Sequence, residues 1–251
     1  MDICTEKKTV SEEDIVKEYG RTWIWTAFDV NSRLIITYLV GDRTLVDCRK
    51  LFKDLSSRIS NKPLFVSDEL PHYKTVIFET FNKAKDVERT GKRGRPSKPI
   101  VTIDDEVDYA VVHKTRENGT VIKVETRVVF GTKERIEERL KKSVSKKINT
   151  SYIERSNGTL RLNDAHLQRK TYKFSKEKDF LKAKLAIIIL FYNFITPHST
   201  LSKNPDKSYT PRTPAQAAGI VDSGIPIPHK SWQGFKHKFK ICVGINSFGF
   251  I

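Results

Sequence analysis

Residues 23–29 (WIWTAFD), 34–40 (LIITYLV) and 64–66 (LFV) decide the fold. The first two runs are rich in β-branched and aromatic residues and are joined by residues 30–33 (VNSR), which have turn chemistry, so they predict an antiparallel hairpin. The third run is too short for a helix and ends beside Asp68, as is typical of a buried strand. These runs predict a sheet.

The segment between the hairpin and this strand has helical spacing. Its apolar residues recur every three or four positions, at Leu45, Cys48, Leu51, Phe52, Leu55 and Ile59. Such spacing predicts an amphipathic helix that covers one face of the sheet, and Pro63 ends it. The order strand, strand, helix, strand is typical of an α/β fold.

The rest of the chain alternates between helical and strand patterns. A second hairpin is predicted from residues 109–114 and 121–130, because Asn118-Gly119 between them is the strongest short turn signal. Residues 85–99 are rich in Gly, Pro, Lys and Arg and predict an exposed basic loop. Helices are predicted at residues 70–83, 132–147, about 150–168 and 176–195, and the remainder from Thr196 is predicted to be irregular.

The charge balance favours a polyanionic partner. Forty-six Lys and Arg stand against thirty Asp and Glu, which gives a formal net charge of +16. Nucleic acid is the leading partner, and the alternative is that the excess only keeps the surface soluble.

Cysteine usage predicts an intracellular protein. Cys4, Cys48 and Cys242 form no CxxC pair, so neither a disulfide framework nor a zinc site is indicated, and we expect a reducing, cytoplasmic compartment. The longest apolar run, residues 185–191, is far below the ~20 residues of a membrane span, and no signal-peptide pattern begins the chain.

Two carboxylates occupy positions suited to a site. Asp68 follows a buried strand, where ligands usually collect at a sheet edge, although a turn or helix-capping Asp is the alternative. In residues 151–169, an apolar stripe of Ile153, Leu160 and Leu167 predicts a helix facing the core. Glu154, Asn157, Arg161 and Gln168 share a polar face of that helix, which points either into a site or into solvent.

The segment around Glu154 resembles a known family. Residues 149–161 (NTSYIERSNGTLR), 169–171 (RKT) and 174–176 (FSK) resemble the block around the catalytic Glu of insertion-sequence DDE transposases, and most closely insertion-sequence family one. Residues 192–201 (YNFITPHSTL) resemble the YNF-x-x-PH-x-x-L end of these enzymes, and residues 213–215 (TPA) also fit.

The earlier strands carry the same resemblance. Residues 66–68 with Tyr73 look like the strand of the second catalytic Asp, and residues 23–29 with 41–44 (GDRT) look like the family's second and third strands. The resemblance implies an RNase H-like fold of the integrase superfamily, with a mixed five-stranded sheet flanked by helices. It implies a catalytic domain over residues 1–195, with residues 84–131 treated partly as an insertion that holds the basic loop and the second hairpin, and an irregular tail over residues 196–251.

The resemblance also implies three catalytic, metal-binding acids: Asp2, Asp68 and Glu154. Asp2 is chosen because residues 2–5 (DICT) resemble the start of the family's first strand, and Asp29, which precedes a turn, is the rival. Asp2 stands almost at the N-terminus, without the leading half of that strand or the upstream DNA-binding region usual in the family, so we expect part of a transposase. Carboxylates suit two Mg²⁺ ions, or Mn²⁺ in their place, which stabilise the attacking and leaving oxygens of phosphodiester transfer.

Basic residues are predicted to bind DNA, both the element ends and the target. Lys92-Arg93-Gly94-Arg95-Pro96 resembles the core of an AT-hook, which enters the minor groove of A·T-rich DNA, and a solvated loop is the alternative. Further phosphate contacts are predicted around the Glu154 helix, from Lys146, Lys147, Arg155, Arg161, Arg169 and Lys170.

The predicted function is therefore metal-dependent DNA cleavage and strand transfer by a transposase, expected to act as a homo-oligomer on DNA and away from membranes. A transposase remnant that only binds DNA is the alternative from another class. A metal-dependent nuclease of the same fold, which cuts without joining, is a third possibility.

Overall fold

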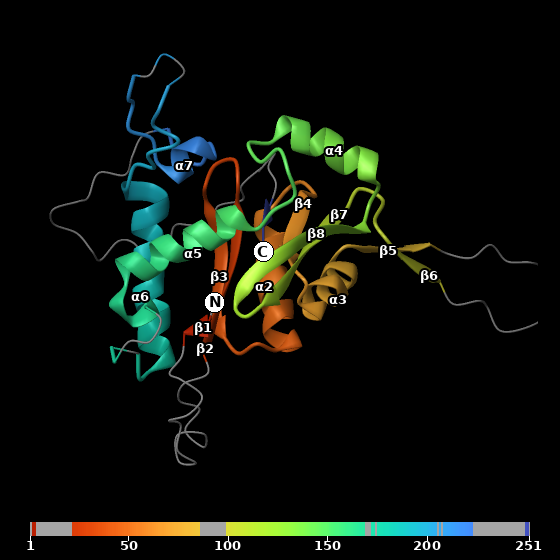
Figure 1. The fold of residues 1–251 in the computed structure, drawn as a ribbon, viewed down its shortest axis with the longest axis horizontal. Coiled ribbons are helices and arrows are strands. Elements are labelled where there is room, and N and C mark those ends of the chain that lie inside the picture. Colours follow the sequence, from red (N-terminus) through yellow and green to blue (C-terminus); the bar gives the residue numbers. More distant parts are fainter. Residues whose placement is uncertain are drawn as a thin grey trace, which may run out of the picture.

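The computed structural model describes residues 22–85, 99–168, 172–173, 175–204, 206 and 208–222, and the backbone alone of residues 2–3 and 249–250. These residues form a mixed α/β structure with strands at the centre and helices around them (Figure 1). The α/β class predicted from the sequence is confirmed.

The first predicted hairpin is confirmed. Strands β2 (Thr22–Asp29) and β3 (Ile35–Gly41) pair antiparallel. Their turn closes where the Asp29 amide donates to the Leu34 carbonyl at 2.8 Å, and Arg33 adopts a left-handed backbone with φ 63°.

The second predicted hairpin is also confirmed, and it is joined to β4 (Leu64–Asp68). Strand β7 (Asp108–Glu117) pairs in parallel with β4 and antiparallel with β8 (Thr120–Phe130), which gives a mixed three-stranded sheet. The turn between β7 and β8 has φ 49° at Asn118 and 81° at Gly119, a conformation that this residue pair favours.

The five-stranded RNase H-like sheet is not seen among the described strands. No direct pairing joins β2 to β4 there. Instead the two-residue strand β9 (Gly249–Phe250) pairs with both, antiparallel to β2 and parallel to β4. Strand β1 (Asp2–Ile3) pairs with the opposite end of β2, also antiparallel. A five-stranded sheet needs one continuous strand between β2 and β4. Among the described residues, only the two-residue strands β1 and β9 lie along that edge of β2.

Residues 84–131, treated partly as an insertion in the sequence-based prediction, hold elements of two kinds. Strand β7 belongs to the mixed sheet, because five of its residues are paired with β4. The part set apart is the ribbon of β5 (Asn82–Lys85) and β6 (Ile100–Ile103), which projects from the body (Figure 1). The basic loop that it flanks lies almost wholly outside the described residues.

Helices cover both faces of the strands. Because side chains alternate along a strand, Phe65 packs with one helix layer while Leu64 and Val66 pack with the other. The first layer consists of α2 (Leu45–Arg58) and α3 (Pro71–Thr80). The second consists of α4 (Lys133–Lys142), α5 (Ser151–Asn163) and α6 (Lys178–Leu190). All five helices were predicted, with longer bounds.

Helix α5 carries the predicted apolar stripe. Ile153 and Leu160 are 7% and 0% exposed, so the predicted stripe is confirmed for these two residues, and Leu167 is also buried but lies in the short turn beyond the helix. The helix ends at Asn163 rather than at residue 168, because Asp164 is extended and its side chain accepts from the His166 amide, which starts a short 3₁₀ turn.

Helix α6 continues into a π-helical turn, Phe191–Ile195, that packs on β3. There the buried Asn193 side chain accepts from the Ile35 amide at 3.1 Å and donates to the Ile35 carbonyl at 2.9 Å. Beyond residue 195 the described chain is irregular apart from the short helix α7 (Pro214–Ala217) and the two-residue strand β9. Residues 223–248 of the predicted tail lie outside the described residues.

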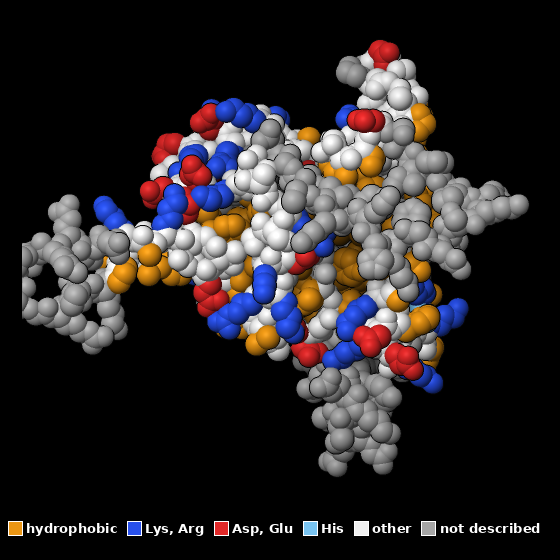
Figure 2. Space-filling model, turned by 180° about the vertical axis from the view of Figure 1, so that it is seen from behind, with side chains coloured by type: hydrophobic (Ala, Val, Ile, Leu, Met, Phe, Trp, Pro, Cys, Tyr) orange, Lys and Arg blue, Asp and Glu red, His pale blue; other side chains and the backbone are white. Residues whose placement is uncertain are grey.

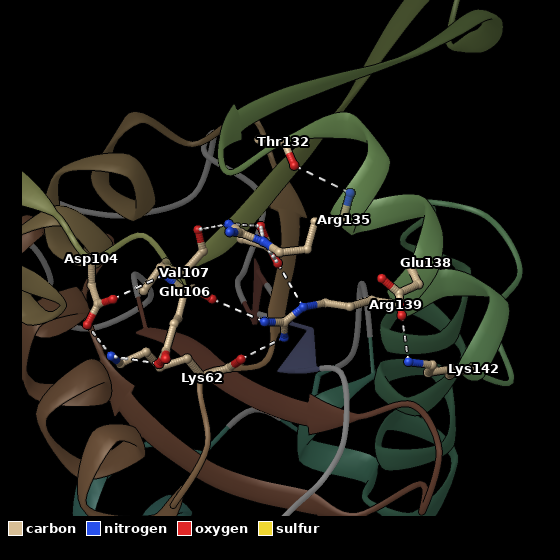
Figure 3. A network of polar contacts seen from close by, with 10 residues as sticks. Lys62, Asp104, Glu106, Val107, Thr132, Arg135, Glu138, Arg139 and Lys142 are labelled. Carbon is tan, nitrogen blue, oxygen red and sulfur yellow. Dashed lines mark hydrogen bonds and ion pairs between the residues drawn. The ribbon is translucent and has the colours of Figure 1, made fainter.

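A fully buried carboxylate ties α4 to the mixed sheet. Asp108, at the start of β7, pairs with Arg135 at 2.5 Å and with Arg139 at 2.8 Å, and both Arg residues are labelled in Figure 3. Gly131 makes room for it: a Cβ there would lie 1.9 Å from Asp108 Oδ1, and the backbone has φ 90°. Arg139 also donates to the carbonyls of Lys62 and Glu106, so the network reaches the loop before β4.

The outer surface of α4 is mixed in charge. In Figure 2 its Lys and Arg side chains are interspersed with Glu side chains, so this helix does not offer a surface of one sign. Of the helices that the structure describes, none combines the length and the apolar character that a membrane crossing requires.

Candidate active site

Two of the three predicted acids line one cavity. Asp68 and Glu154 lie 86 positions apart in the sequence, yet both border a cavity of ≈ 390 Å³. Its walls come from β2, from the end of β4 and the start of α3, from β7 and from the first turns of α5. The fold thus brings together two carboxylates that the sequence alone leaves far apart.

Asp68 reaches the cavity because it is the last residue of β4. The four preceding residues are buried and Asp68 is exposed, as expected where a strand leaves the core at its carboxyl end. Its Oδ1 accepts from the Leu70 amide at 3.4 Å, and Pro71 then starts α3. Burial, and then the negative charge of Asp68, raise the pKa of the neighbouring Tyr73 well above its usual value.

Glu154 enters the cavity from the first turn of α5. The Thr150 hydroxyl donates to its Oε1 at 2.8 Å, and Lys114 Nζ contacts the same oxygen. Burial raises the pKa of Glu154, but hydrogen bonds from Lys114 and Thr150 and the charges of Lys114 and Arg116 outweigh it and hold the pKa below its usual 4.5. Glu154 is therefore ionised at neutral pH, as a metal ligand must be.

This pKa has a consequence for stability. Because the carboxyl is more acidic in the folded chain than in the unfolded one, ionised Glu154 stabilises the fold above about pH 4.5. The contribution is lost as the pH falls through the lower folded-state pKa.

The predicted polar face of α5 is only partly in the cavity. Asn157 lines it together with Glu154, and its Oδ1 accepts from the Thr26 hydroxyl at 3.5 Å, which links α5 to β2. Arg161 and Gln168 do not line it. Gln168 lies beyond the end of α5, so it does not continue the face that Glu154 begins.

The backbone of Asp2 lies beside the cavity wall. In β1, Asp2 is the register partner of Trp23, and Trp23 lines the cavity. The rival, Asp29, follows Trp23 by six positions, or about 20 Å along a strand. Its buried carboxylate accepts from the amides of Asn31 and Ser32, as a turn residue does, and it does not line the cavity.

Cations also surround the acids. Arg43 stacks over the Trp23 ring at 4.6 Å, and Lys114 and Arg116 extend from β7. None of these three residues was predicted from the sequence to be a site residue. Lys114 ends the predicted strand 109–114, and Arg116 lies two positions further on. If the strand continues, both side chains point to the same face, and this spacing is the pattern from which they could have been identified. A site with carboxylates and cations together suits a metal-bound phosphate better than a metal ion alone.

Asp68 and Glu154 fit a hard divalent ion. Both are carboxylates, the ligand type that Mg²⁺ prefers, and both reach a solvent-accessible cavity. Among the residues with described side chains, no three His, Cys, Asp or Glu gather closely enough to hold a metal, and the side chain of Asp2 is not among them. Lys114 competes for one Glu154 oxygen, so a metal there has to displace or share that contact.

The predicted DNA-binding residues have different placements. Lys146, Lys147 and Arg155 are exposed around the start of α5, and Arg161 is partly buried. The other five predicted residues lie outside the described part of the chain: Lys92, Arg93, Arg95, Arg169 and Lys170.

Replacing Lys114 with Met is expected to raise the pKa of Glu154 toward 4.5 and to tighten Mg²⁺ binding, because the competing cation and its hydrogen bond are removed. Carboxyl-carbon NMR of Glu154 and a Mg²⁺ titration measure the two effects. Lys123→Met is the control, since it removes a similar ion pair to Glu125 on β8. An unchanged Glu154 pKa would contradict the assigned role of Lys114.

Comparison of the chain with protein-family models, with curated proteins and with solved structures gives no match in any of the three.

Proposed function

We propose that this protein is a DDE-type enzyme that cuts and joins DNA during transposition of an insertion sequence, with Asp2, Asp68 and Glu154 as its metal-binding acids. The observation that carries the proposal is the shared cavity of Asp68 and Glu154, with the strand of Asp2 beside its wall. The motifs around these residues, quoted above, support the same function.

The proposal extends to the fold. Strands β1 and β9 pair with opposite ends of the same edge of β2, because β3 occupies the other edge. One continuous strand along that edge, between β2 and β4, would complete a five-stranded mixed sheet in the order β3, β2, this strand, β4 and β7. Its far end would carry the first acid to the cavity, as the RNase H-like resemblance requires.

Several polar residues of the cavity have a role in the proposal. The three acids would hold two Mg²⁺ ions, which supply an activated water or 3′ hydroxyl and stabilise the leaving oxygen. Arg43, Lys114 and Arg116 bind the phosphates next to the reacting one, since guanidinium and ammonium groups pair with phosphate oxygens. Asn157 and Thr150 orient α5 and the Glu154 carboxylate.

One contact favours a second candidate, a protein that binds DNA without cutting it. The Lys114 ammonium already neutralises Glu154, so the acid has a protein partner in the absence of metal. In a remnant that only binds DNA, this ion pair would simply stabilise a basic surface. Dependence of DNA cleavage on a divalent metal separates the two candidates.

The test is cleavage of a supercoiled plasmid and joining of a 3′-labelled oligonucleotide, each with Mg²⁺ and with EDTA. We expect nicking and joining with Mg²⁺ and neither with EDTA. Binding without nicking in either Mg²⁺ or Mn²⁺ would favour the second candidate, and nicking without joining would indicate a nuclease.

Replacing Lys92, Arg93 and Arg95 with Ala is expected to weaken DNA binding and to flatten its salt dependence by about one unit of slope per lost phosphate contact. Fluorescence anisotropy across a salt series measures the slope. The control replaces Lys50, Lys53 and Arg58 of α2, which lowers the net charge equally, from +16 to +13. Equal slopes for the two triple variants would assign the effect to net charge and not to the loop.

A further inference from the structure

A second, smaller pocket lies against α5, away from the cavity of Asp68 and Glu154. It has a volume of ≈ 60 Å³ and shares no lining residue with that cavity. At about 100° of rotation per residue, its helix residues Tyr152, Arg155 and Thr159 face opposite to Glu154 and Asn157. The other walls come from the end of β2 and its turn to β3, from the π-helical turn and from the segment after it.

Arg33 is the central cation of this pocket. The residue is only 7% exposed, and its Nε has no hydrogen-bond partner among the described residues. The guanidinium stacks over the Tyr152 ring at 4.3 Å, which supports the charge without using its N–H donors. A buried Arg is normally paired with an acid, and no Asp or Glu lines this pocket.

His198 supplies a second buried polar atom without a partner. Its Nδ1 is buried and makes no hydrogen bond to the described residues. Burial, and then the charges of Arg33 and Arg155, lower the pKa of His198 below its usual 6.5. Burial disfavours the charged imidazole, and the two nearby guanidinium groups add to this effect.

The remaining lining groups are mainly hydroxyls. Ser156, Thr159 and Thr200 add small donors to the two Arg residues and His198, and Arg155 and Thr200 are exposed, so the pocket opens to solvent. A volume of 60 Å³ is about four times the minimum for one water, which gives room for one tetrahedral oxyanion. Donors, positive charge and this size together specify the ligand class.

We infer that this pocket binds a phosphate group, with the guanidinium groups of Arg33 and Arg155 and the imidazole of His198 as its donors. Phosphate suits the site because guanidinium N–H groups pair with its oxygens in a fork geometry. The group can come from a DNA backbone or from free phosphate. A DNA source rests on the proposed function. Because α5 is about 10 Å across, a DNA strand bound in this pocket would reach the Glu154 side of the helix on the order of three nucleotides further along.

The test follows the imidazole of His198 by NMR in the full chain, with EDTA present so that no cleavage is needed. The resonance is identified among the six His by its loss in His198→Gln. Inorganic phosphate, added at constant ionic strength, is expected to raise the pKa of His198, since an anion favours the protonated form. A random-sequence DNA duplex forms the second arm.

Arg33→Gly is the variant of choice, because φ 63° at this position suits Gly and the substitution relieves the backbone while it removes the guanidinium. We expect phosphate affinity to fall at least tenfold with no loss in the unfolding midpoint. Arg58→Gln, an exposed ion-paired residue of α2, is the control and should leave phosphate binding unchanged.

The outcomes separate the two sources of phosphate. If duplex DNA also raises the pKa of His198, and Arg33→Gly lowers the salt slope of DNA binding by about one, the source is DNA. A response to inorganic phosphate alone assigns the site to free phosphate. No shift with either ligand, or equal shifts in Arg33→Gly and the wild type, overturns the inference. Absence of DNA cleavage would overturn the proposed function and leave this result untouched.

Discussion

Glu154→Gln is expected to reduce both DNA cleavage and strand joining by roughly a thousandfold, because the amide lacks the charge that helps to hold the second metal ion at the reacting phosphate. DNA affinity should hold or rise slightly, since a negative charge near the phosphates is removed. Mn²⁺ should restore part of the activity, because it demands less of its ligands than Mg²⁺ does. Parallel nicking and anisotropy assays measure the two effects.

Glu138→Gln is the matched control. Glu138 is also a helical Glu paired with a Lys, and its side chain is 66% exposed against 58% for Glu154, but it lies on α4 and does not line the cavity. We expect wild-type cleavage from it. Wild-type cleavage by Glu154→Gln as well would end the catalytic assignment of Glu154.

Asp108→Asn is expected to destabilise the fold by about 3 kcal/mol, because it breaks a buried ion pair with two Arg residues that stay in place. Asp108 is fully buried, and Arg135 and Arg139 both converge on its carboxylate. An amide can accept from one of them but carries no charge to offset either. Equilibrium unfolding in urea measures the change.

The contrasting substitution is Asp179→Asn on α6. Asp179 pairs with Lys182, and the Asp179 side chain is 91% exposed. We expect a change within about 0.5 kcal/mol there, as for other surface pairs. If the two variants unfold at the same urea concentration, the Asp108 network does not stabilise the junction of α4 and β7.

Local patterns predicted most of the elements because the relevant physics is local. The β-branched and aromatic runs of residues 23–29 and 34–40 and the Asn118-Gly119 pair favour hairpins through local side-chain and backbone preference, and both hairpins are present. The burial of Ile153 and Leu160 on one side of α5 also follows from helical geometry alone, whereas Leu167 is buried in the turn beyond the helix. The error at the end of α5 arose at Asp164, whose side chain caps the next turn.

What the sequence did not predict depends on contacts between distant segments. Strand β5 (NKAK) has no β-branched or aromatic residue, and it is a strand only because β6 pairs with it. The parallel pairing of β7 with β4 likewise has no local signal. Residues 30–33 were interpreted as a turn, and nothing in that pattern connects Arg33 with His198, 165 positions later.

The two hydrogen bonds between Asn193 and Ile35 have a consequence for how molecules of this protein meet in solution. Ile35 is the register partner of Phe28 in β2. Its backbone amide and carbonyl point away from β2, where a strand from a second molecule could otherwise pair with them. The amide side chain of Asn193 satisfies both groups, as a neighbouring strand would. Exposed edges of this kind promote aggregation, and proteins commonly block them with a covering element. The π-helical turn thus acts as a cap on the outer edge of β3, and it protects the molecule from edge-to-edge self-association at that point.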